Sequence, residues 1–167
     1  MEIQVYPAEI LRRRASLVPD PSAVAIRARE MIELMLANDG IGLAAPQVGI
    51  AERFFVLRLP RDRERVFVNP EITERSRRTV RSDESCLSLP GISVDVERAA
   101  RVNVRAWDEH GEPFELSARG LLARAIQHEL DHLNGVLCID RIDTKRRDRL
   151  IRRLEAKSHG TTSGTPS

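Results

Sequence analysis

The sequence predicts an α+β fold, in which helices and strands occupy separate stretches of one domain. Apolar residues recur at helical spacing in three segments, residues 21–38, 118–133 and 143–157. Between the first two helices, short segments alternate apolar and polar residues, as strands do. Two of these strands, residues 102–107 and the segment around Phe114, flank a turn at 108–111, which indicates an antiparallel hairpin.

The N-terminal helix is expected over residues 21–38, where Val24, Met31, Leu34 and Met35 share one face. Asp20 or Ser22 can cap its start, and Gly40 follows its end. The next stretch, residues 40–50 (GIGLAAPQVGI), is expected to be a glycine-rich loop.

Several strands should follow this loop. The expected strands cover residues 53–59, 66–69, 92–96 and 102–107. Residues 75–81 are highly charged and are expected to be exposed. Residues 83–90 (DESCLSLP) form a short segment that holds the first cysteine.

Two further helices complete the expected domain, which covers residues 1–157. The helix at 118–133 is apolar on most sides, so we expect it to be largely buried. The C-terminal helix at 143–157 is rich in arginine, with Leu150, Ile151 and Leu154 facing inward. The polar residues 158–167 are expected to form a disordered tail.

Length and composition indicate a soluble protein in a reducing compartment. The 167 residues suit one domain with a sizeable core. A net charge of +2 gives no reason to expect DNA as a partner. No apolar run reaches the length of a membrane span, and the first 20 residues do not resemble a signal peptide. We therefore expect a cytoplasmic location, no membrane partner, and reduced cysteines.

The strongest chemical signal is the segment 127–132, QHELDH, within the largely buried helix. Four helical residues turn the chain by about 400°, so His128 and His132 lie about 40° apart on one face. Both imidazoles can therefore bind one metal ion. Glu129 lies about 100° further around, where it can contact a water rather than the metal. The alternative is an exposed pair of histidines, which the apolar surroundings disfavour.

Two histidines need a further protein ligand. Downstream, Glu155 lies in the arginine-rich helix and His159 in the expected tail, so neither is attractive. Cys86 is a better candidate, because its segment is short and rich in turn-forming residues. Cys138 is the other possibility, although a small buried apolar role suits it better.

Three segments, GIGLAAPQVG, ESCLS and QHELDH, occur in this order. Together they resemble the three signature motifs of the peptide deformylases. The first motif matches at Gly40, Gly42, Ala44, Ala45 and Gln47, and the third matches throughout. The second motif has Ser85 where the family has glycine. The resemblance covers roughly residues 3 to 155.

The resemblance implies antiparallel sheets packed around a central helix that carries the HExxH motif. It also implies an activity, removal of the N-formyl group from the formyl-methionine of newly made polypeptides. The implied cofactor is one divalent metal ion. Fe²⁺ is the expected ion, with Zn²⁺, Ni²⁺ or Co²⁺ as alternatives.

The family pattern assigns a role to each candidate site residue. Metal ligands are Cys86, His128 and His132. Glu129 would transfer the proton of the attacking water, while the Gln47 side chain and the Leu87 N–H would stabilise the oxyanion. The substrate-binding residues would be Ile41, Gly42, Leu121, Arg124 and Ala125. Gln127 and Asp131 are expected to orient metal ligands, although an exposed helix pair is the alternative for Asp131.

Ser85 and Arg124 depart from the expected pattern. If the position of Ser85 required a positive φ, serine would be strained there. Arg124 lies one turn before His128, where an apolar pocket is expected. The simpler interpretation places the stem of Arg124 along this pocket and its charged head in water. The alternative is a related enzyme that acts on another, acidic N-formyl substrate. A metal-binding relative without catalysis is a third hypothesis, which the presence of Gln47 and Glu129 disfavours.

The expected partners are formyl-methionyl nascent peptides. The arginine-rich helix at 143–157 could also contact ribosomal RNA, although a solvated amphipathic face explains its composition more simply.

Overall fold

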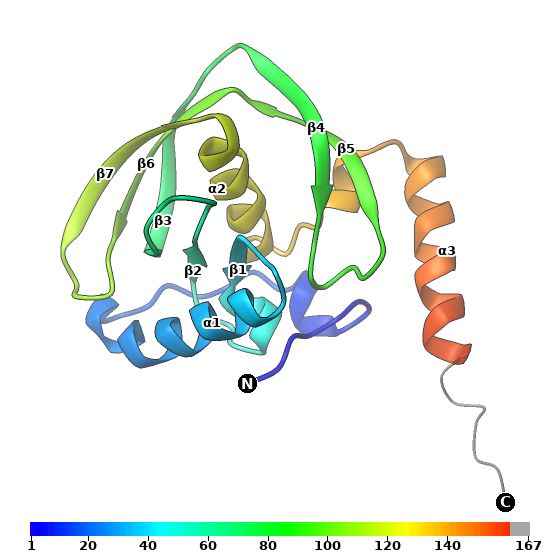
Figure 1. The fold of residues 1–167 in the computed structure, drawn as a ribbon, viewed down its shortest axis with the longest axis horizontal. Coiled ribbons are helices and arrows are strands. Elements are labelled where there is room, and N and C mark those ends of the chain that lie inside the picture. Colours follow the sequence, from blue (N-terminus) through cyan, green and yellow to red (C-terminus); the bar gives the residue numbers. More distant parts are fainter. Residues whose placement is uncertain (161–167) are drawn as a thin grey trace, which may run out of the picture.

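The computed structural model describes residues 1–160 and confirms the α+β fold. Within these residues, an antiparallel five-stranded sheet and a two-stranded ribbon lie on either side of helix α2 (Gly120–Leu133) (Figure 1). Helix α1 (Ala25–Ala37) covers another face of the larger sheet, and helix α3 (Thr144–Gly160) lies at the edge of the molecule. The helix that carries both histidines is thus at the centre, as expected.

The larger sheet has the strand order β1-β2-β3-β6-β7. Its strands are β1 (Gly42–Ala44), β2 (Phe54–Leu57), β3 (Arg65–Arg75), β6 (Arg101–Trp107) and β7 (Pro113–Arg119). The predicted hairpin is confirmed, since β6 and β7 pair in antiparallel register from Arg101↔Arg119 to Trp107↔Pro113. The loop expected at 40–50 is partly strand, because β1 adds to the edge of the sheet.

Strand β2 explains why helices pack on both faces of the sheet. All four of its residues are buried, and successive side chains point to opposite faces. Phe54 and Val56 join the apolar cluster of α1, while Phe55 and Leu57 join the cluster of α2. The predicted cap of the first helical segment is also present, since the Asp20 carboxylate accepts a hydrogen bond from the Ser22 N–H.

The two-stranded ribbon consists of β4 (Thr79–Ser85) and β5 (Ser93–Ala99). The sequence does not predict strand β4, because residues 75–81 resemble an exposed charged segment and residues 83–90 a short connection. Only Glu84 is buried in this strand, so its sequence shows no alternation of apolar residues. Strand β3 likewise runs past the expected end at residue 69, through two irregularities in its pairing with β6.

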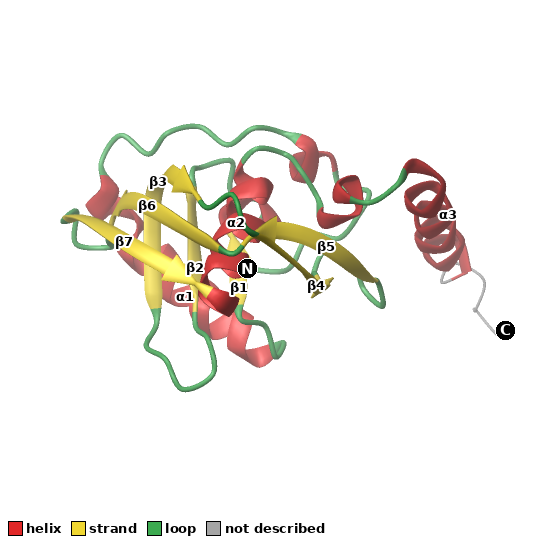
Figure 2. Ribbon diagram, turned by 90° about the horizontal axis from the view of Figure 1, so that it is seen from above, coloured by secondary structure: helices red, strands yellow, loops and turns green. Residues whose placement is uncertain are grey.

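Helix α3 begins close to its predicted start but continues to Gly160, beyond the expected boundary at residue 157. Leu150 and Leu154 are buried in a third apolar cluster with Val94, Val96 and Leu137. Residues 161–167 of the expected tail lie outside the described residues. Figure 2 shows α3 from above, beside the ribbon. Within residues 1–160, no helix combines the length and the apolar character needed to cross a bilayer.

Candidate metal centre and active site

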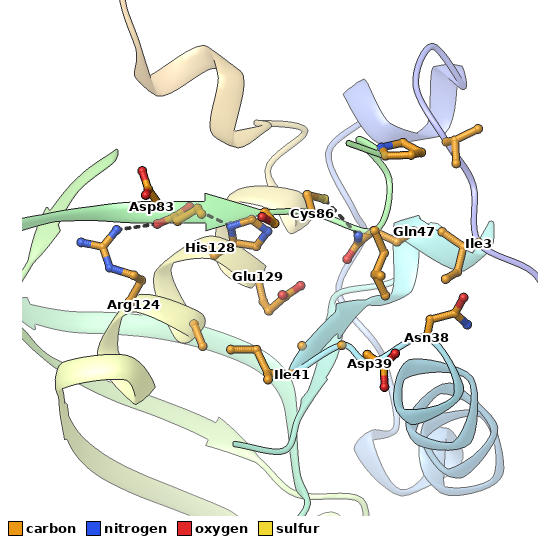
Figure 3. Close-up of a pocket in the computed structure, with 18 of the residues that line it drawn as sticks. Ile3, Asn38, Asp39, Ile41, Gln47, Asp83, Cys86, Arg124, His128 and Glu129 are labelled. Atoms are coloured by element: carbon orange, nitrogen blue, oxygen red, sulfur yellow. Dashed lines mark hydrogen bonds and ion pairs between the residues drawn. The ribbon is translucent and has the colours of Figure 1, made fainter. Parts of the chain in front are cut away.

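Helix α2 and the turn after β4 bring three metal-ligand side chains together. The Nε2 atoms of His128 and His132 are 3.3 Å apart, and the Cys86 Sγ lies 3.3 Å from the His132 Nε2. All three residues are buried. In Figure 3, His128 and Cys86 face the same space from opposite elements. The structure thus brings together the three residues that the sequence predicted as ligands.

The donor atoms fit a transition metal of the size of zinc or iron. Bond lengths of about 2.1 Å to nitrogen and 2.3 Å to sulfur place neighbouring ligands of a tetrahedral ion about 3.4–3.6 Å apart. The two observed separations of 3.3 Å are close to this range. A thiolate and two imidazoles are softer ligands than the oxygen atoms that magnesium and calcium prefer. Three protein ligands also leave a position for water.

The other candidate ligands fit less well. The Cys138 thiol is buried and lies within 4.8 Å of ligand atoms of Glu84 and His128, but burial raises its pKa and so disfavours the thiolate that binds metal. Both carboxylate oxygens of Glu84 already accept hydrogen bonds from Arg98. Glu155 and His159 are exposed on α3, which lies at the edge of the molecule.

Glu84 orients the first histidine. Its Oε2 lies 2.8 Å from the His128 Nδ1, which leaves the Nε2 free to face Cys86 and His132. Burial opposes the charge on Glu84, but the hydrogen bonds from Arg98 and His128 hold the pKa of this carboxyl far below its ordinary value. A charged Glu84 keeps the proton of His128 on Nδ1, which is the tautomer that a ligand through Nε2 requires.

Arg98 extends this network to Asp131. Its Nη1 donates to the Asp131 carboxylate at 2.6 Å, and Arg141 donates to the same carboxylate at 2.6 and 3.0 Å. Asp131 is buried, so the alternative of an exposed helix position is wrong. Among residues 1–160, no hydrogen bond joins Gln127 to a candidate ligand, contrary to expectation. Its amide bonds the backbone N–H and C=O of Ala99 and thereby joins α2 to β5.

Glu129 lies beside the ligands and is only 4% exposed. Its Oε2 has no hydrogen-bond partner among the described residues, so one carboxylate oxygen remains available to a water or substrate. Burial raises the pKa of Glu129 to about 7. A carboxyl group that titrates near neutrality can both accept and return a proton. Gly42 makes room for it, because a Cβ at this position would collide with the Glu129 carboxylate.

Gln47 is held in one orientation opposite α2. Its Oε1 accepts a hydrogen bond from the Ala44 N–H at 2.9 Å, so its Nε2 points toward Cys86 and Ser88, at 3.4 and 3.1 Å. The neighbouring Leu87 N–H donates to no acceptor within residues 1–160. Two neutral donors therefore lie next to the candidate metal ligands.

A cavity of about 640 Å³ opens above this group. All five residues predicted to bind substrate line it, namely Ile41, Gly42, Leu121, Arg124 and Ala125. Its other walls come from the N-terminal segment, the loop after α1 and the end of the ribbon (Figure 3). Leu121 and Ile41 are 48% and 36% exposed, so apolar surface at the mouth is available for a ligand.

The two departures from the family pattern have structural explanations. Ser85 ends β4, paired with Ser93, and is not among the residues with positive φ, so its backbone is unstrained. The expectation that the head of Arg124 lies in water is wrong. Its Nη1 donates to Glu84 at 2.8 Å, and the side chain is 11% exposed. Because Glu84 already neutralises it, Arg124 gives no support to an acidic substrate.

Some residues of the site were not predicted. Arg98, Arg141 and Ser88 contact predicted site residues. Ser88 ends the ESCLS motif but had no predicted role, and Arg98 and Arg141 belong to none of the three motifs. Arg98 and Glu84 lie 14 residues apart and meet only because β4 and β5 pair. Only a prediction of the β4–β5 pairing would have placed Arg98 beside Glu84.

Comparison with known families identifies this arrangement. The sequence profile described as Polypeptide deformylase matches residues 1–148. The chain belongs to the peptide deformylase family. The peptide deformylase of Thermodesulfovibrio yellowstonii is 41% identical over 162 residues, which cover 94% of this chain and 98% of the relative. That of Thermotoga neapolitana is 47% identical over 153 residues, covering 91% and 93%. The resemblance inferred from the three motifs is confirmed.

Solved deformylase structures share the fold of this deformylase throughout. The crystal structure from Ehrlichia chaffeensis has a TM-score of 0.91 at 31% identity and covers 96% of this chain and 98% of its own. The same protein in complex with actinonin also has a TM-score of 0.91, at 32% identity, with 94% and 96% covered. Peptide deformylases are metal-dependent hydrolases, and the Cys86, His128 and His132 group offers this one a metal site.

Proposed function

We propose that this deformylase hydrolyses the N-formyl group of formyl-methionine at the start of new polypeptides. One observation supports this most strongly, the buried Glu129 carboxylate with a partnerless oxygen beside three metal-ligand atoms at the base of the cavity. The reaction needs such a group, because water is a poor nucleophile and an amine is a poor leaving group.

Glu129 transfers the proton in the proposed mechanism. Its carboxylate accepts a proton from water as the water oxygen bonds to the formyl carbon. It then delivers this proton to the peptide nitrogen as the C–N bond breaks, which releases formate and a free amine. Burial favours the protonated form of Glu129 and so helps its carboxylate to accept the proton of the water.

Gln47 and Leu87 would stabilise the oxyanion of the tetrahedral intermediate. The Gln47 Nε2 and the Leu87 N–H are neutral donors beside the ligand group, and the Ala44 N–H holds the Gln47 amide in place. Preorganised donors of this kind need no rearrangement when the negative charge develops.

Cys86, His128 and His132 would hold one divalent ion. When bound, such an ion supplies Lewis acidity that lowers the pKa of water and polarises a carbonyl oxygen. We propose Fe²⁺ as the physiological ion, with Zn²⁺, Ni²⁺ and Co²⁺ as alternatives that the same donors accept. With iron, the Cys86 thiolate would make the enzyme sensitive to oxygen.

The methionine side chain would enter the cavity between Leu121, Ala125 and the stem of Arg124. These residues lie on the first two turns of α2, directly before His128. A peptide could then extend toward the mouth past Ile41 and Gly42. Actinonin, which is bound in the Ehrlichia chaffeensis structure, is therefore a suitable ligand with which to test the cavity.

We place the reaction in the cytoplasm, where nascent formylated chains occur, with no DNA or membrane partner. Helix α3 carries seven basic residues between Lys145 and Lys157, so contact with ribosomal RNA is a further hypothesis. A solvated face of this helix remains the simpler explanation.

The test is hydrolysis of formyl-Met-Ala-Ser by protein prepared without oxygen and loaded with Fe²⁺ or Ni²⁺. We expect turnover that falls by about a hundredfold or more in Glu129→Ala, with its metal content retained. A parallel assay with a formyl-Glu peptide should show much slower hydrolysis. Absence of turnover in folded, metal-loaded protein, or preference for the acidic peptide, would contradict the proposal.

A further inference from the structure

Among residues 1–160, Arg124 is the only side chain of α2 that forms hydrogen bonds with both strands of the ribbon. Its Nη2 donates to the Val80 carbonyl of β4 at 2.6 Å, and its Nη1 donates to the Val96 carbonyl of β5 at 2.9 Å. The Nη1 also reaches the Glu84 Oε1 at 2.8 Å. A planar guanidinium can bond several acceptors in fixed directions, so the spacing of the strands is held.

The ribbon depends on contacts of this kind. A two-stranded sheet is at best marginally stable alone, and β4–β5 pairs with no strand of the larger sheet. Its inward face packs through Val94 and Val96, but the cavity side of β4 contributes Asp83, Glu84 and Ser85, which are polar. On that side, the hydrogen bonds of Arg124 hold the ribbon where apolar packing is absent.

Arg124 is also a wall of the substrate cavity. Its stem lines the cavity from α2, and the end of the ribbon that its guanidinium bonds forms the neighbouring wall (Figure 3). The position of the ribbon relative to α2 therefore depends in part on this side chain, alongside the contacts that Gln127, His128 and Asp131 make with the ribbon. We infer that Arg124 is a positioning residue, which anchors the β4–β5 ribbon to α2 and so sets the width of the pocket for the first side chain of the substrate.

This role is separable from metal binding. Without Arg124, both Glu84 oxygens would still accept hydrogen bonds from Arg98, and the Glu84 Oε2 would still face the His128 Nδ1. Loss of the anchor should therefore affect the pocket and leave the ligand group in place. The inference rests on the proposed function for its kinetic consequence, while its structural consequence can be measured without any substrate.

The test compares Arg124→Met and Arg124→Lys with Arg81→Met as a matched control. Methionine keeps an apolar stem without the guanidinium, and Arg81 is an exposed arginine of the same ribbon. Hydrogen exchange of the β4–β5 amides should be faster by about tenfold in Arg124→Met, with the amides of β2 and β3 unchanged. Metal content should equal that of the parent protein. Arg81→Met should behave as the parent in both measurements.

Kinetics then test the pocket. For formyl-Met-Ala-Ser, Arg124→Met should raise KM about tenfold and change kcat by less than about twofold. Its preference for formyl-Met-Ala-Ser over the bulkier formyl-Phe-Ala-Ser should fall by about fivefold. Arg124→Lys should give intermediate values, because an ammonium group cannot reach both strands and Glu84 together. If Arg124→Met does not fold, the lysine variant alone carries the comparison.

Three outcomes would overturn the inference. If hydrogen exchange and KM in Arg124→Met equalled those in Arg81→Met, Arg124 would not anchor the ribbon. If Arg124→Lys equalled the parent protein in every measurement, only a positive charge beside Glu84 would be needed. Loss of metal would place the role of Arg124 at the ligands. If the parent protein hydrolyses no formyl peptide, the proposed function fails, whereas the exchange measurement still decides the anchor.

Discussion

At the scale of single residues, the site depends on the pairing of a glycine with a buried carboxylate. Gly42 begins β1, and a Cβ there would overlap the Glu129 carboxylate and approach Leu57 at 2.9 Å. A displaced Glu129 carboxylate would have to move into the cavity that it lines, away from its position beside the candidate ligands. The absence of a side chain at Gly42, in the first motif, thus leaves space for Glu129, in the third motif, in addition to any contact with substrate.

Gly42→Ala should displace Glu129 and lower kcat for formyl-Met-Ala-Ser by about tenfold or more, because proton transfer depends on the position of the carboxylate. Metal content should stay constant, since no ligand is changed. The control is Gly160→Ala, where a Cβ would meet no atom of the other described residues within 4 Å. An unchanged kcat in Gly42→Ala would show that Glu129 tolerates displacement.

At the scale of elements, buried ionic contacts connect the ribbon to α2 where apolar packing is limited. Glu84 of β4, Arg98 of β5 and Asp131 of α2 are each buried and linked by bonds of 2.6–2.9 Å. Each charge has an opposite partner, so removal of one would leave another buried and uncompensated. This requirement holds the three elements in one arrangement.

The lowered pKa of Glu84 predicts how stability responds to acid. The folded protein keeps this carboxyl ionised at a pH where the unfolded chain, with an ordinary pKa near 4.5, binds a proton. The contribution is therefore complete above the unfolded value and is lost as the pH falls below it. In the presence of a chelator, the free energy of unfolding should fall more steeply in the parent protein than in Glu84→Gln between about pH 5 and pH 3.

Chemical denaturation at several pH values measures this difference. Glu71→Gln is the matched control, because Glu71 makes an exposed ion pair with Arg105 on the larger sheet. Exposed pairs contribute little, so this variant should follow the parent curve. Parallel curves for the parent and Glu84→Gln would contradict the assigned role of Glu84.

At the scale of the whole molecule, three apolar clusters surround the site from different sides. One joins α2 to the larger sheet, a second joins α1 to the opposite face, and the third joins α3 to the ribbon. Helix α3 contributes no residue to the cavity. Its packing should therefore support stability without direct influence on the reaction.

Leu154→Ala should lower the free energy of unfolding by about 2 kcal/mol, because it removes a buried side chain of the third cluster. Its kcat and KM should equal those of the parent protein. Arg153→Ala, at an exposed position of the same helix, should leave stability almost unchanged. A marked change of KM in Leu154→Ala would mean that α3 also controls the pocket. Denaturation in urea and the formyl-Met-Ala-Ser assay provide both measurements.

Local patterns were sufficient to predict the elements with a strong apolar period. The helices around Met31, Ile126 and Leu150 and the β6–β7 hairpin follow from spacing and turn residues alone. The ligand pair His128 and His132 is also a local property, since four helical residues bring two side chains to one face. Cys86 was favoured as the third ligand from its turn-rich segment, and family resemblance implied the same role for it and an oxyanion-donor role for Gln47.

The tertiary structure decided what depends on pairing between distant segments. Strand β4 has too few buried residues for a periodic signal, so its pairing with β5 could not be predicted from local spacing. The same pairing places Arg98 beside Glu84 and presents the carbonyls of Val80 and Val96 to Arg124. The sequence alone determined the chemistry of the side chains. Their partners, burial and pKa values depended on which backbone segments meet, because hydrogen bonds and desolvation act only at short range.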